Sequence, residues 1–257
     1  MSQSFRKISA QLARQIKLVM TDVDGTIAAG GEPAGTAVTQ AIHCLEEQRI
    51  TVGLVSGRTL PELEQMAHDL DITGPIIAEN GGVAKLKVGA GLVDLGYSRQ
   101  AALEALGKLQ KMYPGVIKER SDNKDRIIDV VFFSDSIKPA ELRNHLGETQ
   151  LLDSGYIFHL MQAGISKGKT LKRLLGMLPD KNLSASDVII FGDSLTDMSL
   201  FELFPHCVLV PNPLLAGQHR KELEQVAGYI SDSASEAGFI EVTTHILNVR
   251  SNHISLT

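Results

Sequence analysis

The sequence predicts an α/β fold in which a parallel sheet is interrupted by a smaller α+β insert. Short apolar runs alternate with amphipathic segments over residues 16–80, and the same alternation resumes at residue 167. Strands and helices that alternate with short connections form parallel sheets with right-handed crossovers. Between the two regions the pattern changes to short strand-like segments and two helices. We therefore expect a core over residues 1–82 and 163–257 and an insert over residues 83–162.

The first part of the expected core has three strands, over residues 16–20, 51–55 and 75–79. Their uninterrupted apolar runs are typical of strands that are buried on both faces. The helix between the first two strands begins at Thr36, whose hydroxyl suits an N-terminal cap. The next helix carries Pro61 in its first turn, where proline is favoured.

The insert and the second part of the core are assigned in the same way. In the insert we expect strands over residues 83–87, 92–95, 116–120, 126–133, 150–153 and 157–161, and helices over residues 100–112 and 139–146. The core then continues with helices over residues 167–178, 198–203, 222–227 and 236–247, and with strands over residues 188–191, 207–210 and 229–231. Glycines at both boundaries of the insert, at residues 81–82 and 164, are candidate hinges.

The composition excludes several classes of protein. A formal net charge of −5 argues against a protein that binds nucleic acid through phosphate contacts. No apolar run approaches the roughly 20 residues that cross a bilayer, and residues 1–15 lack the apolar centre of a secretory signal. Cys44 and Cys207 lie in apolar contexts and are expected to be buried thiols. We expect a cytoplasmic protein, monomeric or homodimeric, with no nucleic-acid or membrane partner.

Two carboxylates follow the first strand, one residue apart. Asp22 and Asp24 stand at its carboxyl end, which is the edge where open α/β sheets bind ligands. Carboxylates there are costly unless a cation, hydrogen-bond donors or a proton compensates them. Gly25 allows a sharp turn directly after them. Taken alone, this stretch is better explained as an ordinary Asp-Gly turn, but three further polar stretches overturn that interpretation.

The topology brings these three stretches to the same edge of the sheet. They are Ser56-Gly57 after the second strand, Lys167 at the start of a helix, and Asp193 with Asp197 after a later strand. Each of them alone also fits a solvated turn or helix end. Together they place carboxylates, a hydroxyl, glycine amides and one cation around a single cleft. Clustered carboxylates without histidine or thiolate partners favour a hard cation such as Mg²⁺.

These residue types predict phosphoryl transfer. Asp22 is placed to attack phosphorus and form an aspartyl-phosphate, and Asp24 to protonate the leaving oxygen and then activate water. Ser56, Lys167 and the amide of Gly57 would hold the phosphate oxygens, where charge collects in the transition state.

Three more side chains are expected to complete and support the site. Asp193 would complete the set of metal ligands. Asp197 would orient Lys167 or a metal-bound water. Thr26 is placed with Asp197 among the supporting residues.

In order and spacing, the polar stretches resemble the four motifs of the haloacid dehalogenase-like phosphatases. The matching segments are Asp22-Val23-Asp24-Gly25-Thr26, Ser56-Gly57-Arg58, Lys167-Gly168, and Gly192-Asp193-Ser194 continuing to Asp197. The insert after Glu79-Asn80-Gly81-Gly82 resembles the larger α+β cap of the branch that contains sucrose-phosphate, mannosyl-3-phosphoglycerate and archaeal-type phosphoglycolate phosphatases. The resemblance covers nearly the whole chain and implies a Rossmann-like parallel-sheet core with an inserted cap.

For individual residues, the resemblance implies a nucleophile at Asp22, an acid/base at Asp24, and phosphate ligands at Ser56 and Lys167. It also implies Mg²⁺ held by the Asp22 side chain, the Asp24 carbonyl and Asp193.

Two positions need comment. Lys169 also flanks Gly168, but the Lys-Gly pattern of the family favours Lys167 as the phosphate ligand. Thr196 departs from the pattern, because many relatives have asparagine there, and this puts in doubt any contact that the amide makes.

The leaving group of the substrate is expected to meet the cap, which would close over the core and exclude water. Candidate specificity residues are Arg58 and Asn80 from the core and Arg120, Arg126 and His159 from the cap. The segment over residues 154–161 is similar to the same part of archaeal-type phosphoglycolate phosphatases. This similarity favours a small phosphorylated acid over a disaccharide phosphate.

Two other functions stay open. A phosphotransferase or phosphomutase would use the same scaffold and pass the aspartyl-phosphate to a hydroxyl instead of water. A phospho-accepting receiver also uses strand-end acids, a hydroxyl and a lysine, but it needs a much shorter chain and no cap. We predict a Mg²⁺-dependent phosphatase that hydrolyses a small phosphorylated metabolite, either a phosphoglycolate-like acid or a sugar phosphate, through an aspartyl-phosphate.

Overall fold

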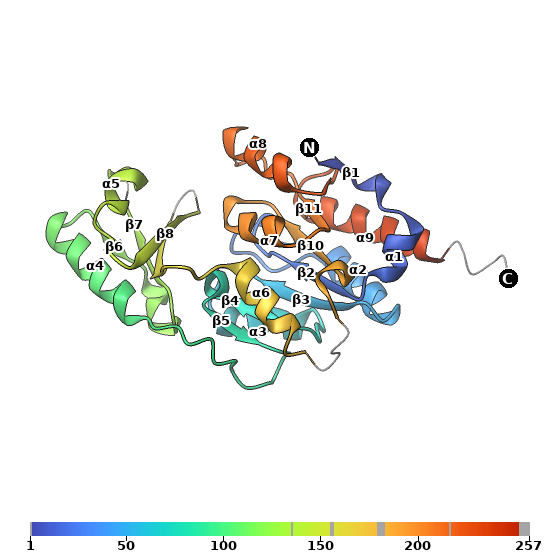
Figure 1. Ribbon diagram of the computed structural model, residues 1–257, viewed down its shortest axis with the longest axis horizontal. Helices are drawn as coiled ribbons and strands as arrows, with labels where there is room; N and C mark the ends of the chain where they lie inside the picture. The colour runs from blue at the N-terminus through green and yellow to red at the C-terminus, as the bar shows by residue number, and fades with distance from the viewer. Residues whose placement is uncertain (1, 135, 155–156, 179–182, 216, 252–257) are drawn as a thin grey trace.

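The computed structural model describes residues 2–134, 136–154, 157–178, 183–215 and 217–251. A larger and a smaller unit lie side by side (Figure 1). In the described residues the larger sheet has eight strands in the order β1-β12-β11-β10-β2-β3-β4-β5. Their bounds are Gln3–Ser4 (β1), Leu18–Thr21 (β2), Thr51–Val55 (β3), Ile76–Ala78 (β4), Val83–Lys85 (β5), Val188–Gly192 (β10), Cys207–Leu209 (β11) and Tyr229–Ile230 (β12). All neighbours are parallel except β4 and β5. The α/β class predicted from the sequence is confirmed.

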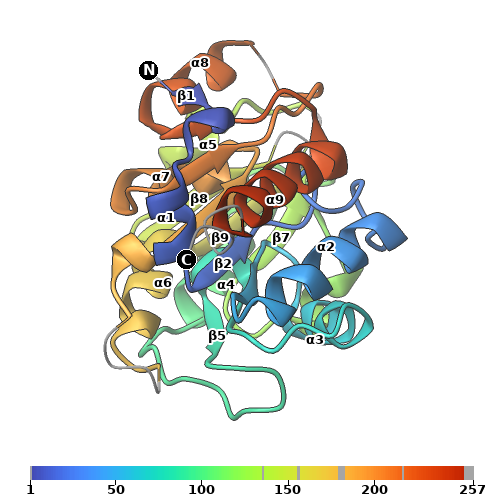
Figure 2. The same cartoon turned by 90° about the vertical axis from the view of Figure 1, so that its right-hand side faces the viewer.

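Helices cover both faces of this sheet, which is why its central strands are almost entirely apolar. Val19 of β2 packs in the cluster with α1 (Ala10–Gln15), α2 (Thr36–Glu47), α3 (Leu60–Asp69) and α9 (Ser235–Ser251). The adjacent residue Met20 packs in the opposite cluster, with α6 (Lys167–Leu175), α7 (Met198–Leu203) and α8 (Gly217–Val226). Figure 2 shows α1, α2, α3 and α9 together on the face toward the viewer.

The smaller unit, called the cap below, has its own sheet and core. Its antiparallel strands run in the order β6-β7-β9-β8, with bounds Lys118–Glu119 (β6), Val130–Phe133 (β7), Thr149–Asp153 (β8) and Phe158–Gln162 (β9). The helices α4 (Gln100–Met112) and α5 (Pro139–Arg143) pack against it. Phe132 and Phe158 stack at its centre with ring centroids 5.3 Å apart. Because this cluster is separate from the two core clusters, the cap packs as a unit of its own.

Short 3-10 helices connect several of these elements. They are η1 (Phe5–Lys7), η2 (Glu79–Gly81), η3 (Ser121–Asp125), η4 (Ala185–Asp187) and η5 (Leu195–Asp197). Two of them lie at the carboxyl edge of the larger sheet: η2 directly follows β4, and η5 begins three residues after β10 ends.

The segment over residues 83–95 belongs to the larger sheet, so its assignment to the insert was wrong. β5 pairs antiparallel with β4, and Ala84 lies opposite Ile77. The returning segment forms one bridge, between Lys85 and Leu92, and Leu95 packs in the core cluster of α6 and α7. The alternating pattern indicates a strand, but it does not specify which sheet the strand joins.

Two further expectations differ from the structure. The segment before β2 forms β1, η1 and α1, none of which was expected from the sequence, and Phe5 and Leu12 bury their side chains against the core. Cys44 is exposed, whereas Cys207 is buried. Cys44 lies on the outer side of α2 because the adjacent Leu45 faces the core. None of the described helices has the length and apolar character needed to cross a bilayer.

Candidate active site

Three buried carboxylates converge at the carboxyl edge of the larger sheet. The pairing of β2 with β10 puts the amide of Asp22 2.9 Å from the carbonyl of Phe191, so Asp193 follows close by. Carboxylate atoms of Asp22, Asp193 and Asp197 lie within 4.8 Å of one another. The strand order thus brings together acids that are far apart in the chain.

Lys167 provides a cation among these acids. Its side chain is 1% exposed, and Nζ lies 3.1 Å from Oδ1 of Asp22 and 2.7 Å from Oδ1 of Asp197. It also donates to the hydroxyl of Thr196 at 3.1 Å, so the residue that departs from the family pattern still contacts the lysine. Lys169, in contrast, is exposed, and its Nζ donates to the carbonyl of Gly164.

Gly168 explains how the lysine reaches the site. A Cβ at this position would lie 2.1 Å from the carbonyl oxygen of Ser199. Only glycine therefore allows the first turn of α6 to pack against the backbone of α7. The amide of Gly168 also donates to the hydroxyl of Ser199 at 3.1 Å.

Asp197 holds the loop that carries Asp193. Its Oδ2 accepts from the amides of Asp193 at 3.0 Å and Ser194 at 3.1 Å, while Oδ1 accepts from Lys167. Both oxygens are therefore occupied by protein donors. Asp197 therefore contacts Lys167 and the loop at the same time, and it is not among the described residues that line the cavity, whereas Asp22 and Asp193 are.

Three residues surround the carboxylate of Asp193. Thr26 donates to Oδ1 at 3.3 Å, and Asn212 donates to Oδ2 at 2.5 Å. Gly25 has φ +83°, and a Cβ there would lie 2.4 Å from Oδ2 of Asp193. Asn212 was not among the candidate site residues, although it follows β11 at the same sheet edge.

The electrostatics of this cluster are dominated by burial. Burial raises the pKa of Asp22 well above its usual range, and the charge of Asp197 adds to the rise. Burial and the charge of Asp197 also raise the pKa of Asp193 to about 7. Burial lowers the pKa of Lys167, but Asp197 and Asp22 outweigh it and raise the pKa above its usual value. The single ammonium group of Lys167 offsets only part of the charge of the three acids. The remaining negative charge suits a divalent cation with oxygen ligands.

Asp24 faces a different partner. Arg58 donates to its two carboxylate oxygens, from Nη2 at 2.7 Å and from Nε at 2.9 Å, and the amide of Gly31 donates at 2.9 Å. Burial raises the pKa of Asp24, but the hydrogen bonds from Arg58 and Gly31 lower it below its usual value. In this arrangement Asp24 is held as a carboxylate.

The loop after β3 and the 3-10 helix after β4 lie next to each other. Ser56 is buried, and its hydroxyl accepts from the amide of Arg58 at 3.2 Å. A Cβ on Gly57 would lie 3.0 Å from Nδ2 of Asn80, so the amide of Asn80 packs directly against this glycine. Asn80 has φ 54° and is 1% exposed, and neither polar atom of its side chain has a partner among the described residues.

Glu79 joins the core to the cap. It is fully buried, and its carboxylate accepts from the amides of Ile127, Ile128 and Asp129 at 2.7–2.9 Å. Burial raises the pKa of Glu79, and the charge of Asp129 adds to the rise. This anchor was not recognised from the sequence, because its partners are backbone amides far along the chain.

The two cap arginines are both ion-paired. Arg120 Nε lies 3.0 Å from Oδ1 of Asp122. Arg126 pairs with Asp122 and with Asp129, at 2.9 and 2.7 Å, and also donates to the carbonyl of Gly57 at 3.0 Å. Arg126 therefore fixes the cap to the loop after β3.

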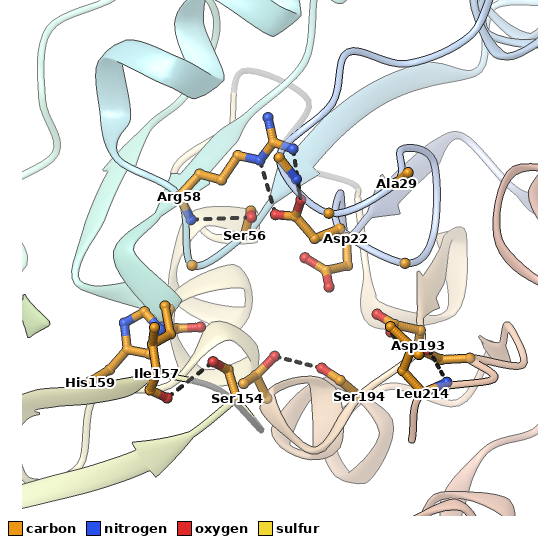
Figure 3. Close-up of a pocket in the computed structure, with 18 of the residues that line it drawn as sticks. Asp22, Ala29, Ser56, Arg58, Ser154, Ile157, His159, Asp193, Ser194 and Leu214 are labelled. Atoms are coloured by element: carbon orange, nitrogen blue, oxygen red, sulfur yellow. Dashed lines mark hydrogen bonds and ion pairs between the residues drawn. The ribbon is translucent and has the colours of Figure 1, made fainter. Parts of the chain in front are cut away.

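His159 of β9 is also buried, at 3% exposure, and its Nδ1 lies 2.7 Å from Oδ2 of Asp129. All the sequence-predicted site residues from both units line or adjoin one cavity of about 510 Å³. In Figure 3, Asp22, Ser56 and Arg58 of the core lie across this cavity from Ser154, Ile157 and His159 of the cap.

Comparison with known proteins decides the family. A sequence model of the haloacid dehalogenase-like hydrolases matches residues 19–117 and 97–242. The chain belongs to this family. Because curated relatives are phosphatases, this haloacid dehalogenase-like hydrolase is a phosphatase enzyme. The phosphoglycolate phosphatase of Methanoculleus marisnigri is 30% identical over 232 residues, which cover 88% of this chain and 94% of the relative. Phosphoglycolate phosphatase 1 of Saccharolobus solfataricus is 29% identical, covering 90% and 96%.

Solved structures show the same fold for this haloacid dehalogenase-like phosphatase. The crystal structure of Thermoplasma acidophilum 0175 superimposes with a TM-score of 0.77 at 24% identity, covering 90% of this chain and 98% of that one. The sucrose-phosphatase of Synechocystis, solved with sucrose and phosphate, gives a TM-score of 0.67 at 18% identity, covering 91% and 98%. The expected Rossmann-like core of the family is thereby confirmed.

Proposed function

We propose that the protein is a Mg²⁺-dependent phosphatase that hydrolyses a small phosphorylated metabolite, a phosphoglycolate-like acid or a sugar phosphate, through an aspartyl-phosphate on Asp22. The observation that carries the proposal is the buried cluster of Asp22, Asp193, Asp197 and Lys167 beside a cavity that the cap also lines. Such a cluster combines a nucleophile, a cation and ligands for a divalent metal ion at one point.

The donor set fits Mg²⁺, because it consists of carboxylate and carbonyl oxygens without nitrogen or sulfur. The Asp22 side chain, the Asp24 carbonyl and the Asp193 side chain would hold the ion. When bound, Mg²⁺ offsets the charge of these carboxylates and of the phosphoryl oxygens. Thr26 and Asn212 keep Asp193 in place, since both donate to its carboxylate.

The reaction proceeds in two displacements. An oxygen of Asp22 attacks phosphorus, the bond from phosphorus to the leaving oxygen breaks, and Asp24 donates a proton to that oxygen. Water then attacks the aspartyl-phosphate while Asp24 accepts its proton, which releases phosphate and restores Asp22. Because Asp24 is a carboxylate while it pairs with Arg58, it has to leave this ion pair and take up a proton before it can protonate the leaving oxygen.

Lys167, Ser56 and the amide of Gly57 bind the phosphate oxygens in this proposal. Lys167 stays charged because its pKa is raised by Asp197 and Asp22 despite burial. A fixed positive charge in a site shielded from water stabilises the charge that develops on the transferring phosphoryl group.

Support for the substrate class comes from the relatives. Curated proteins that match over about nine-tenths of this chain are phosphoglycolate phosphatases of several archaea. A small phosphorylated acid fits a cavity of about 510 Å³ that is partly closed by the cap. We also propose that the protein acts in the cytoplasm, as a monomer or a homodimer.

The experiment is an assay of phosphate release from a panel of phosphorylated metabolites, with Mg²⁺ and with a chelator. We expect release that requires Mg²⁺, and we expect Asp22→Asn to abolish it while the thermal unfolding curve stays cooperative. Added acceptor alcohols test the alternative phosphotransferase, because a transferase would phosphorylate the alcohol in preference to releasing phosphate. Turnover by Asp22→Asn that equals the wild-type rate would reject the nucleophile.

A further inference from the structure

We propose that His159, oriented by Asp129, and Asn80 together bind the carboxylate of a short phosphorylated acid. This inference rests on the proposed function and deepens it, because it selects the acid over the sugar phosphate as the substrate class. It also assigns recognition to an imidazole and an amide, and not to the arginines of the cavity.

The arginine and lysine side chains that line the cavity already have carboxylate partners. Within the described residues these pairs are Arg58 with Asp24, Arg120 with Asp122, Arg126 with Asp122 and Asp129, and Lys167 with Asp22 and Asp197. A substrate carboxylate that binds there would compete with an anion already paired to the same side chain. Such binding gains less than binding to a group without an anion partner, because the charge of the cation is already offset.

His159 is different, because one of its nitrogens is free for a ligand. Nδ1 is engaged by Asp129 at 2.7 Å, while Nε2 has no hydrogen-bond partner among the described residues, and the ring lines the cavity. A histidine held in this way by a carboxylate has a fixed ring orientation, and its protonated form donates from Nε2 to an anion.

Asp129 is suited to orient this histidine. It is fully buried, and its two oxygens contact His159 and Arg126. Burial raises the pKa of Asp129, but His159 and Arg126 outweigh this effect and lower it. Asp129 therefore stays ionised and holds the imidazole through Nδ1.

Asn80 supplies the second polar group. Its amide lines the same cavity at 1% exposure with neither Nδ2 nor Oδ1 paired in the described part of the chain. Buried amides are nearly always hydrogen-bonded, so an unpaired one that faces a cavity indicates a missing ligand. The left-handed backbone at φ 54° is a conformation that asparagine tolerates and most other side chains do not.

The contact of Glu79 with the cap positions both Asn80 and His159. Glu79, which precedes Asn80, accepts from the amide of Asp129 at 2.9 Å, and Asp129 in turn contacts His159. The amide of Asn80 also packs on Gly57, which lies in the proposed phosphate-binding loop. The carboxylate subsite therefore adjoins the phosphate site, and this favours an acid with a short carbon chain.

The test compares 2-phosphoglycolate with 2-hydroxyethyl phosphate, which has the same length but a hydroxymethyl group instead of the carboxylate. For the wild type we expect kcat/KM to be at least tenfold higher for phosphoglycolate. In His159→Asn, whose amide retains the Nδ1 contact with Asp129 but lacks Nε2, we expect this ratio to fall about tenfold or more, mainly through KM. In His159→Gln, whose amide reaches the Nε2 position, the ratio should fall less.

Two more variants complete the design. Asn80→Gly keeps the left-handed backbone accessible and removes the amide, so we expect it to lower the same ratio severalfold. His145→Asn is the matched control: it makes the same substitution at a half-buried histidine of the cap, which contacts Tyr113 and does not line the cavity, so it should leave the ratio unchanged.

The outcomes distinguish a failure of the proposed phosphatase function from a failure of the carboxylate subsite. If the wild type releases no phosphate from either compound or from 4-nitrophenyl phosphate with Mg²⁺, the proposed function is wrong. If it releases phosphate but prefers 2-hydroxyethyl phosphate, or if His159→Asn and Asn80→Gly lower both substrates equally, only the carboxylate subsite is wrong. Because the ratio is measured within each folded variant, a change in stability alone does not alter it.

Discussion

Lys167 and Asp197 form a fully buried ion pair, with Nζ 2.7 Å from Oδ1 and both side chains at most 1% exposed. The second oxygen of Asp197 accepts from the amides of Asp193 and Ser194. A single carboxylate therefore fixes both the cation and the loop that carries a proposed metal ligand. Among the described residues, Asp197 is not one of those that line the cavity.

We predict that Asp197→Asn lowers the free energy of unfolding by about 3 kcal/mol and kcat by roughly 10²-fold, because an amide leaves one buried donor unpaired and Lys167 without its nearest anion. Urea denaturation measures the first effect and steady-state phosphate release the second.

Asp187→Asn is the control for this variant. Asp187 forms the same Ser-x-x-Asp capping box, with Ser184, but this box is exposed on the surface. We expect a loss of about 1 kcal/mol or less and no change in kcat. Equal losses in both variants would mean that Asp197 is only a helix cap.

Mg²⁺ should stabilise the protein more at high pH than at low pH. Burial and Asp197 raise the pKa of Asp193 to about 7, whereas the usual value is 3.8. Between these values the metal-free folded state binds a proton that the unfolded chain has lost, so stability falls as the pH rises. Mg²⁺ needs the ionised carboxylate, and it therefore meets no competing proton above this range.

The measurement is the thermal midpoint with Mg²⁺ and with a chelator at about pH 5.5 and about pH 8, compared by linkage. We expect the Mg²⁺-induced rise in Tm to be larger at the higher pH. Asp193→Asn should abolish the rise and flatten the pH dependence of the metal-free protein. A rise of the same size at both pH values, or in the variant, would argue against a metal site at Asp193.

Arg58 should control the protonation of Asp24. Burial raises the pKa of Asp24, and the hydrogen bonds from Arg58 and Gly31 more than offset it. Without Arg58, burial dominates, so the pKa of Asp24 rises and more of the acid form is present at a given pH. We predict that Arg58→Ala moves the alkaline limb of the kcat/KM profile to higher pH by about one unit.

This shift depends on the leaving group. It should be clear for 2-hydroxyethyl phosphate, whose leaving alkoxide needs a proton, and weak for 4-nitrophenyl phosphate, whose leaving phenolate does not. Arg58→Lys keeps the charge but not the bidentate contact, so we expect an intermediate shift of the alkaline limb. Identical profiles for wild type and Arg58→Ala on the alkyl substrate would show that Arg58 does not tune Asp24.

The sequence was sufficient to place the acids at one sheet edge, because each follows an apolar run that is recognisable by itself. Asp22 and Asp193 come together through the β2–β10 pairing, and that pairing follows from the alternation of strands and helices. Lys167 is brought in by the helix that starts after the cap. These are local signals combined with a general rule of topology.

Side-chain partners could not be obtained in this way. Nothing local in the sequence indicates that Arg58 pairs with Asp24, or that Glu79 accepts from backbone amides near residue 128. Such contacts depend on how the cap lies on the core. The same reason explains β5: its pattern specifies a strand, but the choice between the two sheets is decided by the edge that β4 leaves open.

Two glycines with nearly the same left-handed backbone distinguish the effect of backbone strain from the effect of displacing Asp193. Gly25 has φ +83° and Gly31 has φ +82°, but a Cβ on Gly25 would lie 2.4 Å from Oδ2 of Asp193, whereas a Cβ on Gly31 would have no atom within 4 Å. Gly31→Ala should therefore cost about 1–2 kcal/mol of stability from the left-handed backbone alone, with little change in kcat. Gly25→Ala should cost at least as much and also displace the Asp193 carboxylate, so that Mg²⁺-dependent phosphate release falls by roughly 10²-fold. Chemical denaturation and phosphate release on both variants decide the matter: if Gly31→Ala loses as much activity as Gly25→Ala, backbone strain and not the position of Asp193 is responsible.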